Sequence, residues 1–210
     1  MFNDGDIEQV EHATEEIDKY IDYRAKNSFQ KNFLRKLCKC ISVGISIWCG
    51  DTYIGEQKDP KELLVYQQFF CKLVQLICMM ERNSIHLDRA EARFLKSIKY
   101  NGIIYRYLGS SDHNNRSRIH PITCSQYVSW TKDKDKIYPY IRQKLYGPIT
   151  LIAYDIDEND FGIDLVGFYD YCCSNEIRIS WNSRRFENEV VYQTPQISED
   201  KIAFIEDEVE

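Results

Sequence analysis

The feature that most constrains this chain is a change in the spacing of its apolar residues near residue 101. Before that point, apolar side chains recur every three or four residues, which is the period of an amphipathic helix. After it, short alternating or continuous apolar runs are separated by polar, Gly-containing loops, a pattern typical of strands and turns. The pattern therefore predicts an α+β fold, with an N-terminal helical lobe followed by a mixed, mainly antiparallel β core.

The same periods predict the individual elements. Helices are expected within residues 6–25, 29–50, 59–80 and 88–100, and a short helix within 133–147. Strands are expected within 102–109, 125–131, 148–156, 162–169, 175–181, 188–194 and 200–209. The third helix is apolar on most of its faces, so we expect it at the centre of the helical lobe. We place the domain boundary between residues 98 and 99, giving a lobe of residues 1–98 and a β core of residues 99–210.

Composition narrows the classes of function. The net charge of −6 argues against a dedicated DNA- or membrane-binding surface. The N-terminus is acidic and polar, unlike a signal peptide, and we expect no apolar run long enough to cross a bilayer. Eight cysteines without a C-x-x-C pair indicate free thiols in a reducing cytoplasm. A zinc site built from Cys38, Cys40 and Cys49 is disfavoured by its one-residue spacing.

Three short stretches contain residues suited to chemistry. Arg106 lies in an apolar run, where a charged side chain needs a partner, and its planar fork suits a diphosphate or carboxylate. Ser129 and Thr131 are two residues apart on a strand and share a face. Glu187 and Glu189 are expected to share a face by the same rule. Two neighbouring carboxylates repel each other, so the pair either lies in solvent or has a functional role. Each stretch alone also fits an ordinary role in a sheet.

Taken together and in this order, the three stretches resemble the Arg-Ser-Glu class of mono-ADP-ribosyltransferases, which includes many bacterial toxins and phage-encoded enzymes. In that family an Arg lies on the first core strand, a Ser-Thr-Ser-like stretch on the next, and an E-x-E pair opens a later strand. The matching positions are Arg106, Ser129-Trp130-Thr131 and Glu187-Asn188-Glu189. The resemblance covers roughly residues 95–208.

The resemblance implies an ADP-ribosyltransferase-type core that binds NAD as co-substrate and needs no metal. Glu189 is then expected to bind the 2′-hydroxyl of the nicotinamide ribose and to stabilise the developing cation. Ser129 is expected to hold Glu189 in its rotamer, with Thr131 in support. Arg106 is expected to grip the phosphates or the adenosine ribose. Glu187 is expected to face the acceptor and either to orient it or to take its proton.

The resemblance also bears on partners. A Glu at the first E-x-E position favours arginine on a protein as acceptor, while a base of RNA or DNA is an alternative acceptor. The stretch 114–120, followed by Tyr127 and Trp130, fits a solvated loop with a few charges, with contact to a single nucleic-acid strand as the alternative. Tyr107, Trp130 and Phe168 are the candidates for stacking on nicotinamide or adenine. Small relatives act as toxins or effectors, so we expect a cytoplasmic or host-delivered protein, with an antitoxin as a candidate regulatory partner.

Two positions depart from the family's pattern. Trp130 occupies the middle of the Ser-Thr-Ser-like stretch, and Tyr107 follows the Arg where a small residue is common. These departures leave two alternatives open. One is a non-enzymatic interaction protein with a degenerate NAD-site-like sheet, and the other is an NAD glycohydrolase with water as acceptor.

Overall fold

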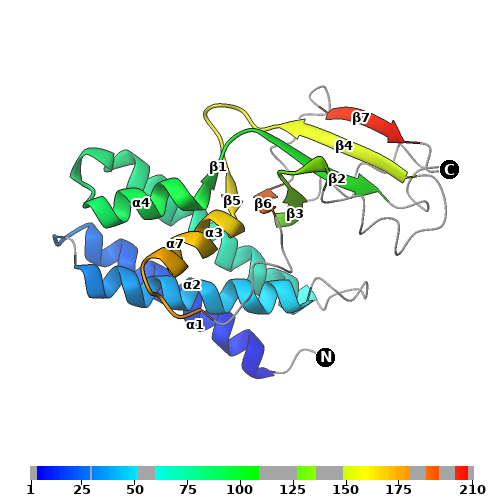
Figure 1. Ribbon diagram of the computed structural model, residues 1–210. Coiled ribbons are helices and arrows are strands. Elements are labelled where there is room, and N and C mark those ends of the chain that lie inside the picture. Colours follow the sequence, from blue (N-terminus) through cyan, green and yellow to red (C-terminus); the bar gives the residue numbers. More distant parts are fainter. Residues whose placement is uncertain are drawn as a thin grey trace. The chain divides into compact units, whose positions relative to one another are not determined.

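The chain folds into two compact units, which we treat separately (Figure 1). A computed structural model describes residues 4–28, 30–51, 60–108, 127–135, 149–179, 188–193 and 202–207. The helical unit comprises residues 1–98 and 167–185, and the sheet unit comprises residues 99–166 and 186–210. The predicted α+β fold is therefore present, with helices first and an antiparallel sheet after them. The segment 167–185, which we assigned to the β core from sequence, lies in the helical unit.

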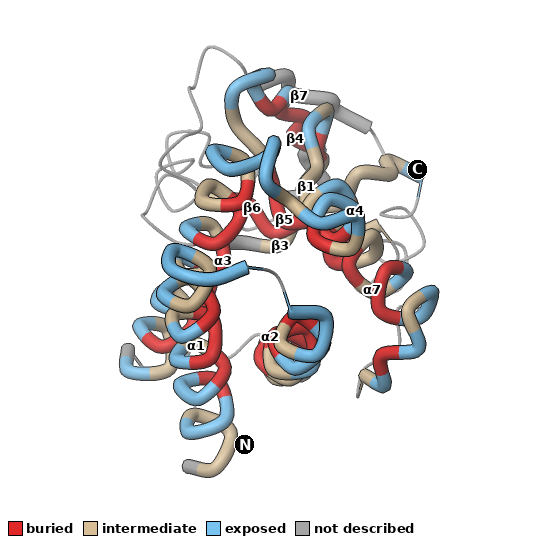
Figure 2. Tube along the Cα trace, turned by 90° about the vertical axis from the view of Figure 1, so that its left-hand side faces the viewer, coloured by how far each residue is buried: buried red, intermediate tan, exposed pale blue. Residues whose placement is uncertain are grey.

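The helical unit is built around buried stripes on amphipathic helices. Its elements are α1 (Asp4–Arg24), α2 (Lys31–Asp51), α3 (Pro60–Arg82), the 3-10 turn η1 (Ser84–His86), α4 (Arg89–Ile98) and most of α7 (Leu165–Ser174). Figure 2 shows the buried residues as red segments along α1, α2 and α3. Phe69, Phe70 and Leu73 of α3 are fully buried, so α3 supplies much of this core, as the sequence predicts.

Helix α3 also corrects one expectation. By length and composition alone, Lys61–Arg82 is apolar enough to cross a membrane, whereas we expected no such run. The core helix of a soluble protein passes the same test, because both must bury apolar side chains on most faces. Leu76, Ile77 and Met80 continue the fully buried stripe of α3 within the helical unit.

A buried carboxylate ties α1 to the start of α4. Glu91 is fully buried. Arg24 donates to its two carboxylate oxygens, from Nε at 2.6 Å and from Nη2 at 3.0 Å. The hydroxyl of Tyr20 donates to the same carboxylate at 2.7 Å. Glu91 also accepts from the backbone N–H of Asp88, whose own carboxylate accepts from the N–H of Ala90. This reciprocal pair is a capping box at the first turn of α4. Burial, together with the bond to Glu91, raises the pKa of Tyr20 far above its usual value.

The sheet unit is a seven-stranded sheet, and every strand pairing within its described residues is antiparallel. The strands are β1 (Lys99–Tyr100), β2 (Ile103–Leu108), β3 (Tyr127–Thr131), β4 (Ile149–Asp155), β5 (Gly162–Asp164), β6 (Glu189–Gln193) and β7 (Ile202–Asp207). Their order is β1-β5-β6-β3-β2-β4-β7. Strands β2, β3 and β6, which carry residues of the three predicted stretches, are thus consecutive in the sheet.

One face of the sheet carries a buried apolar cluster. Its buried members are Ile104, Trp130, Ile152, Tyr154, Ile156, Val190 and Tyr192, with Tyr100 packed against them. These residues come from four strands and the start of a loop, and alternate along each strand with residues of the other face. The cluster therefore fixes the register of β2, β3, β4 and β6, since a one-residue slip would expose it.

Two predicted strands are wrong in part. The run 162–169 is strand only over Gly162–Asp164 and then becomes α7, in which Leu165, Phe168 and Cys172 are fully buried at helical spacing. A short continuous apolar run does not distinguish strand from helix by period. Residues 175–179 form a turn and extended chain in place of a strand, and Glu176 has a φ of 54° there. Most of the helix expected within 133–147 lies outside the described residues.

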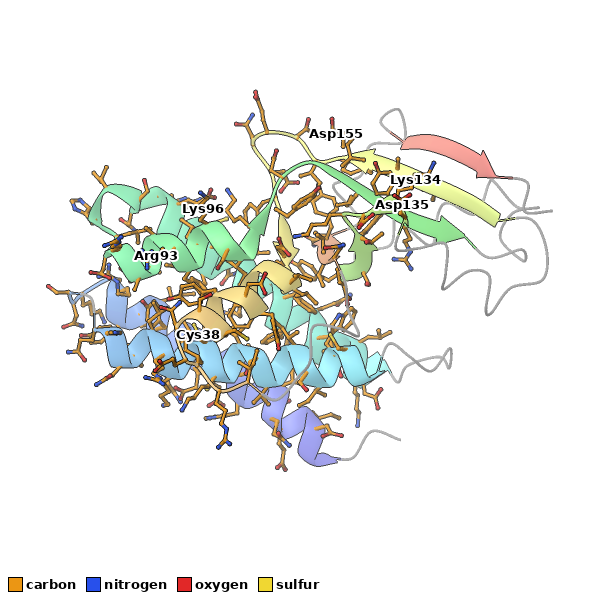
Figure 3. All side chains as sticks on the ribbon, in the orientation of Figure 1. Cys38, Arg93, Lys96, Lys134, Asp135 and Asp155 are labelled. Atoms are coloured by element: carbon orange, nitrogen blue, oxygen red, sulfur yellow. The ribbon has the colours of Figure 1, made fainter. Side chains whose placement is uncertain are left out.

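The thiols agree with a reduced protein. All seven cysteines within the described residues are free, and Cys38, Cys49 and Cys172 are buried; Cys124 lies outside that set. Cys38, labelled in Figure 3, is beside Cys172, and burial together with this contact raises the pKa of the Cys38 thiol well above its usual value. In the part of the chain that the structure describes, no group of His, Cys, Asp and Glu side chains is placed to hold a metal ion.

Replacing Glu91 tests the buried network. Glu91→Ala leaves Arg24 and Tyr20 without their shared acceptor and removes half of the capping box. We expect the free energy of unfolding, measured by urea titration, to fall by about 3–5 kcal/mol, as for other broken buried pairs. Glu11→Ala, at an exposed position on α1, is the control and should change it by less than about 0.5 kcal/mol. A loss at Glu91 no larger than the control's would contradict this role.

Candidate functional site

The structure brings two of the predicted residues, Ser129 and Glu189, into direct contact. Ser129 lies in the middle of β3, and Glu189 is the first residue of β6. The hydroxyl of Ser129 donates to Oε1 of Glu189 at 2.6 Å across 60 residues of chain. The ladder pairs Ser129 with Val191 and Thr131 with Glu189, so the hydroxyl and the carboxylate are diagonal neighbours on one face.

The contact holds a largely buried carboxylate. Glu189 is 7% exposed. A hydrogen bond to a charged oxygen is short and stronger than a neutral one, so it favours one rotamer of the Glu189 side chain. Val190 and Val191, the next residues of β6, are buried and anchor the strand on its two faces. Glu189 is therefore held by its own strand and by the neighbouring one.

Thr131 and Trp130 lie on opposite faces of β3. Thr131 lies opposite Glu189 in the ladder, and its hydroxyl donates to the carbonyl of Asp133 at 3.3 Å and accepts from its N–H at 3.2 Å. Trp130 was predicted to contact NAD, but it is 2% exposed within the apolar cluster on the other face. The reason is strand alternation: the residue between Ser129 and Thr131 must point to the opposite side.

Arg106 is not brought to the carboxylate by the sheet. On β2, Tyr105 pairs with Thr131, and Arg106 pairs with Ile152 of β4. Because cross-strand partners share a face, Arg106 lies on the side of the apolar cluster, with its Nη1 buried. Ser129 and Glu189 lie on the opposite side. Spacing within one strand predicts which of its residues share a face, whereas the register between strands decides which face that is.

The remaining predicted residues are placed as follows. Tyr107 belongs to β2 and pairs with Leu151, but its side chain lies outside the described set. Phe168, a candidate for stacking on NAD, is instead fully buried in the helical unit against Phe94, with ring centroids 6.1 Å apart. Glu187 and the stretch 114–120 lie outside the described residues.

We expected Glu187 and Glu189 to share one face of a strand. That expectation requires an extended backbone at Asn188, the residue between them. Asn188 has a φ of 66°, in the left-handed region that Asn enters more readily than most residues. The strand begins only at Glu189. The period-two rule therefore does not hold across Asn188, and the sequence pattern alone could not reveal this break.

A turn next to Glu189 contains residues that the sequence analysis missed. The backbone N–H of Lys132 donates to the carbonyl of Asn188 at 2.9 Å, and Nδ2 of Asn188 donates to Oδ2 of Asp133 at 3.0 Å. The other oxygen of Asp133 accepts from the N–H of Asp135 at 3.0 Å. Figure 3 labels Lys134 and Asp135 in this turn. The turn after β3 is thereby bonded to the residue that precedes Glu189.

An ion pair closes the neighbouring edge of the apolar cluster. Nζ of Lys132 lies 2.6 Å from Oδ2 of the buried Asp164 on β5 and 5.5 Å from the ring centroid of Tyr100. Burial, and then the negative charge of Asp164, raise the pKa of Tyr100 above its usual value. Lys132 directly follows β3 and Asp164 ends β5, and these two strands flank β6, so the pair supports the sheet around Glu189.

One cavity of the described structure lies in the helical unit, and Ser129 and Glu189 do not line it. A cavity of about 170 Å³ in the helical unit is lined by Arg24, Ala25, Met79, Met80, Asn83, His86, Leu87 and Glu91. Ser129 and Glu189 lie in the other unit, and the chain segments 109–126, 136–148 and 180–187 that adjoin β3 and β6 in sequence are outside the described residues.

Comparisons with known proteins identified no relative of this chain. A scan of protein-family models, a search of curated proteins and a search of solved structures each found no match to the chain. Any functional assignment therefore rests on the residues and their arrangement.

A double-mutant cycle tests the central contact independently of any activity. Ser129→Ala, Glu189→Ala and the double variant are compared by urea unfolding. Hydrogen bonds to charged groups contribute about 1.5–3 kcal/mol, so we expect a coupling free energy in that range. The control cycle pairs Ser129→Ala with Glu158→Ala at an exposed position and should be additive within about 0.5 kcal/mol. Equal coupling in the two cycles would show that the contact contributes nothing.

Proposed function

We propose that this chain is a mono-ADP-ribosyltransferase that transfers ADP-ribose from NAD to a macromolecular acceptor. The observation that carries the proposal is the 2.6 Å bond from Ser129 to the largely buried carboxylate of Glu189. It joins the second and third of the predicted stretches at the positions where the Arg-Ser-Glu family has its serine and its second acid. The adjacency of β2, β3 and β6 also supports the proposal.

The proposed chemistry cleaves the bond between nicotinamide and C1′ of the ribose. The bonding electrons leave with nicotinamide, and positive charge develops on the sugar. Glu189 accepts a hydrogen bond from the ribose 2′-hydroxyl and stabilises that charge. A nucleophilic atom of the acceptor then bonds to C1′ and loses its proton, for which Glu187 is the proposed base.

The surroundings of Glu189 suit this task. A carboxylate with little exposure interacts more strongly with a nearby cation than one in water does, because the local dielectric constant is lower. The Ser129 hydroxyl donates to one carboxylate oxygen and so orients the side chain of Glu189. A preorganised group of this kind costs no reorganisation as the cation forms.

The acceptor and setting follow from the same resemblance. We propose arginine on a protein as the favoured acceptor, since the carboxylate of Glu187 can pair with a guanidinium. A nucleic-acid base is the alternative acceptor. A cytoplasmic toxin or effector, controlled by an antitoxin or another regulatory protein, is the proposed setting, with NAD as co-substrate and no metal.

One observation favours a second candidate function. Arg106, the proposed grip on the phosphates, lies on the face opposite Ser129 and Glu189. A sheet that keeps the carboxylate but carries Arg106 on its other face fits a non-enzymatic interaction protein with a degenerate NAD site. The two candidates differ in whether the protein consumes NAD.

Labelled NAD separates these candidates. The protein is incubated with NAD labelled in its adenylate part and a cell lysate, which is then split into protease- and nuclease-treated halves. We expect macromolecules to carry the label, and protease to remove it. Removal of the label by nuclease would instead identify a nucleic-acid acceptor. Release of free ADP-ribose without transfer would instead identify an NAD glycohydrolase. Neither transfer nor cleavage, with no thermal shift at millimolar NAD, would reject the enzyme and favour the interaction protein.

Substitution of the two acids tests their assigned roles. Glu189→Gln should reduce cleavage and transfer by roughly 10²–10³-fold, as expected when one preorganised transition-state contact is lost. Glu187→Ala should reduce transfer more than cleavage. Glu158→Gln, an exposed change in the sheet unit, is the control and should leave both rates unchanged. Full transfer by a folded Glu189→Gln protein would exclude the assignment of Glu189.

A further inference from the structure

The entry into β6 is held by an unusual set of contacts centred on Asn188. This residue combines a φ of 66° with two hydrogen bonds to the turn after β3, one through its carbonyl and one through its side-chain amide. A left-handed backbone at a non-glycine residue persists where the surrounding structure supports it. Here that support comes from Lys132 and Asp133.

Asp133 connects this support to the rest of the turn. Its Oδ2 accepts from Asn188, its Oδ1 accepts from the N–H of Asp135, and its own N–H donates to the Thr131 hydroxyl. Thr131 is in turn the cross-strand partner of Glu189. Asn188, which precedes Glu189, and Thr131, which pairs with Glu189 across the strands, are therefore both hydrogen-bonded to Asp133.

We propose that Asn188 and Asp133 form a positioning latch that sets the direction of Glu189 for the reaction. This inference rests on the proposed function and adds to it two residues that the resemblance does not assign. The bond from Ser129 fixes the end of the Glu189 side chain, and the latch fixes the backbone from which that side chain projects.

The latch acts through geometry and touches no reacting atom. A carboxylate that is displaced by a fraction of an ångström binds the substrate almost as well but stabilises the transition state less. Loss of the latch should therefore lower kcat for NAD cleavage and leave KM for NAD nearly unchanged. A merely structural residue would lower stability without this split.

The test exploits the complementary chemistry of the pair. Asn188→Gly keeps the left-handed backbone and removes the amide, while Asn188→Asp sets two carboxylates against each other. Each should lower kcat about tenfold and change KM by less than about twofold. Combining Asn188→Asp with Asp133→Asn restores an amide facing a carboxylate, and the new amide oxygen can still accept from Asp135. This swap should return kcat to within about threefold of the unmodified protein.

Two further measurements make the result decisive. The Lys132 amide, which donates to Asn188, should exchange with solvent about tenfold faster in Asn188→Gly, while amides of the β2–β4 pairing are unchanged. Asn101→Gly is the matched control: it removes an amide that donates to the carbonyls of Asp157 and Asp160 in the same unit. It should leave kcat unchanged.

The outcomes separate the latch from the proposed function. An Asn188→Gly protein with unchanged kcat and unchanged Lys132 exchange overturns the latch alone, provided that the unmodified protein cleaves NAD. A loss of kcat that the swap does not restore also overturns it. Absence of NAD cleavage by the unmodified protein, under conditions where its Lys132 amide is protected, overturns the proposed function and the positioning role together.

Discussion

The pairing of β6 with β3 is the interaction on which the rest of the candidate site depends. It joins segments 60 residues apart and places β6 inside the sheet, between β5 and β3. The ladder runs from Tyr127 opposite Gln193 to Thr131 opposite Glu189, and the Lys132–Asn188 backbone bond extends it into the turn. Such a long-range pairing costs loop-closure entropy, which the burial of β6 on both of its faces offsets.

Two buried glutamates show how the partners of a carboxylate decide its role. Glu91 is matched by the guanidinium of Arg24, so its charge is neutralised where α1 meets α4. Glu189 accepts a hydrogen bond from the hydroxyl of Ser129, which orients its side chain across the sheet. A carboxylate bonded to a guanidinium stabilises the fold, whereas one oriented across a sheet by a hydroxyl is a preorganised group of the kind that our proposal requires. Our proposal places the chemistry at the second of these glutamates, in the sheet unit.

Local patterns predicted some elements well and others poorly. The long helices followed from a 3.6-residue period repeated over five or six turns, and the strands β2, β3, β4 and β6 followed from short apolar runs bounded by polar loops. The run 162–169 is too short to distinguish the two periods, and only its burial pattern in α7 shows that most of it is helical. Trp130 was predicted to contact NAD because it is an aromatic residue within a motif. The alternation of side chains along β3 instead directs it into the apolar cluster.

The sequence by itself determined the α+β order, the helical core around α3 and the candidacy of Ser129 and Glu189, because these depend on spacing within single elements. Only the tertiary structure decided that the hydroxyl and the carboxylate meet, and that Arg106 faces the other way. It also revealed the left-handed Asn188 and its bond to Asp133. The physical reason is that register between strands and contacts across a turn are set by packing among distant segments, which no local period encodes.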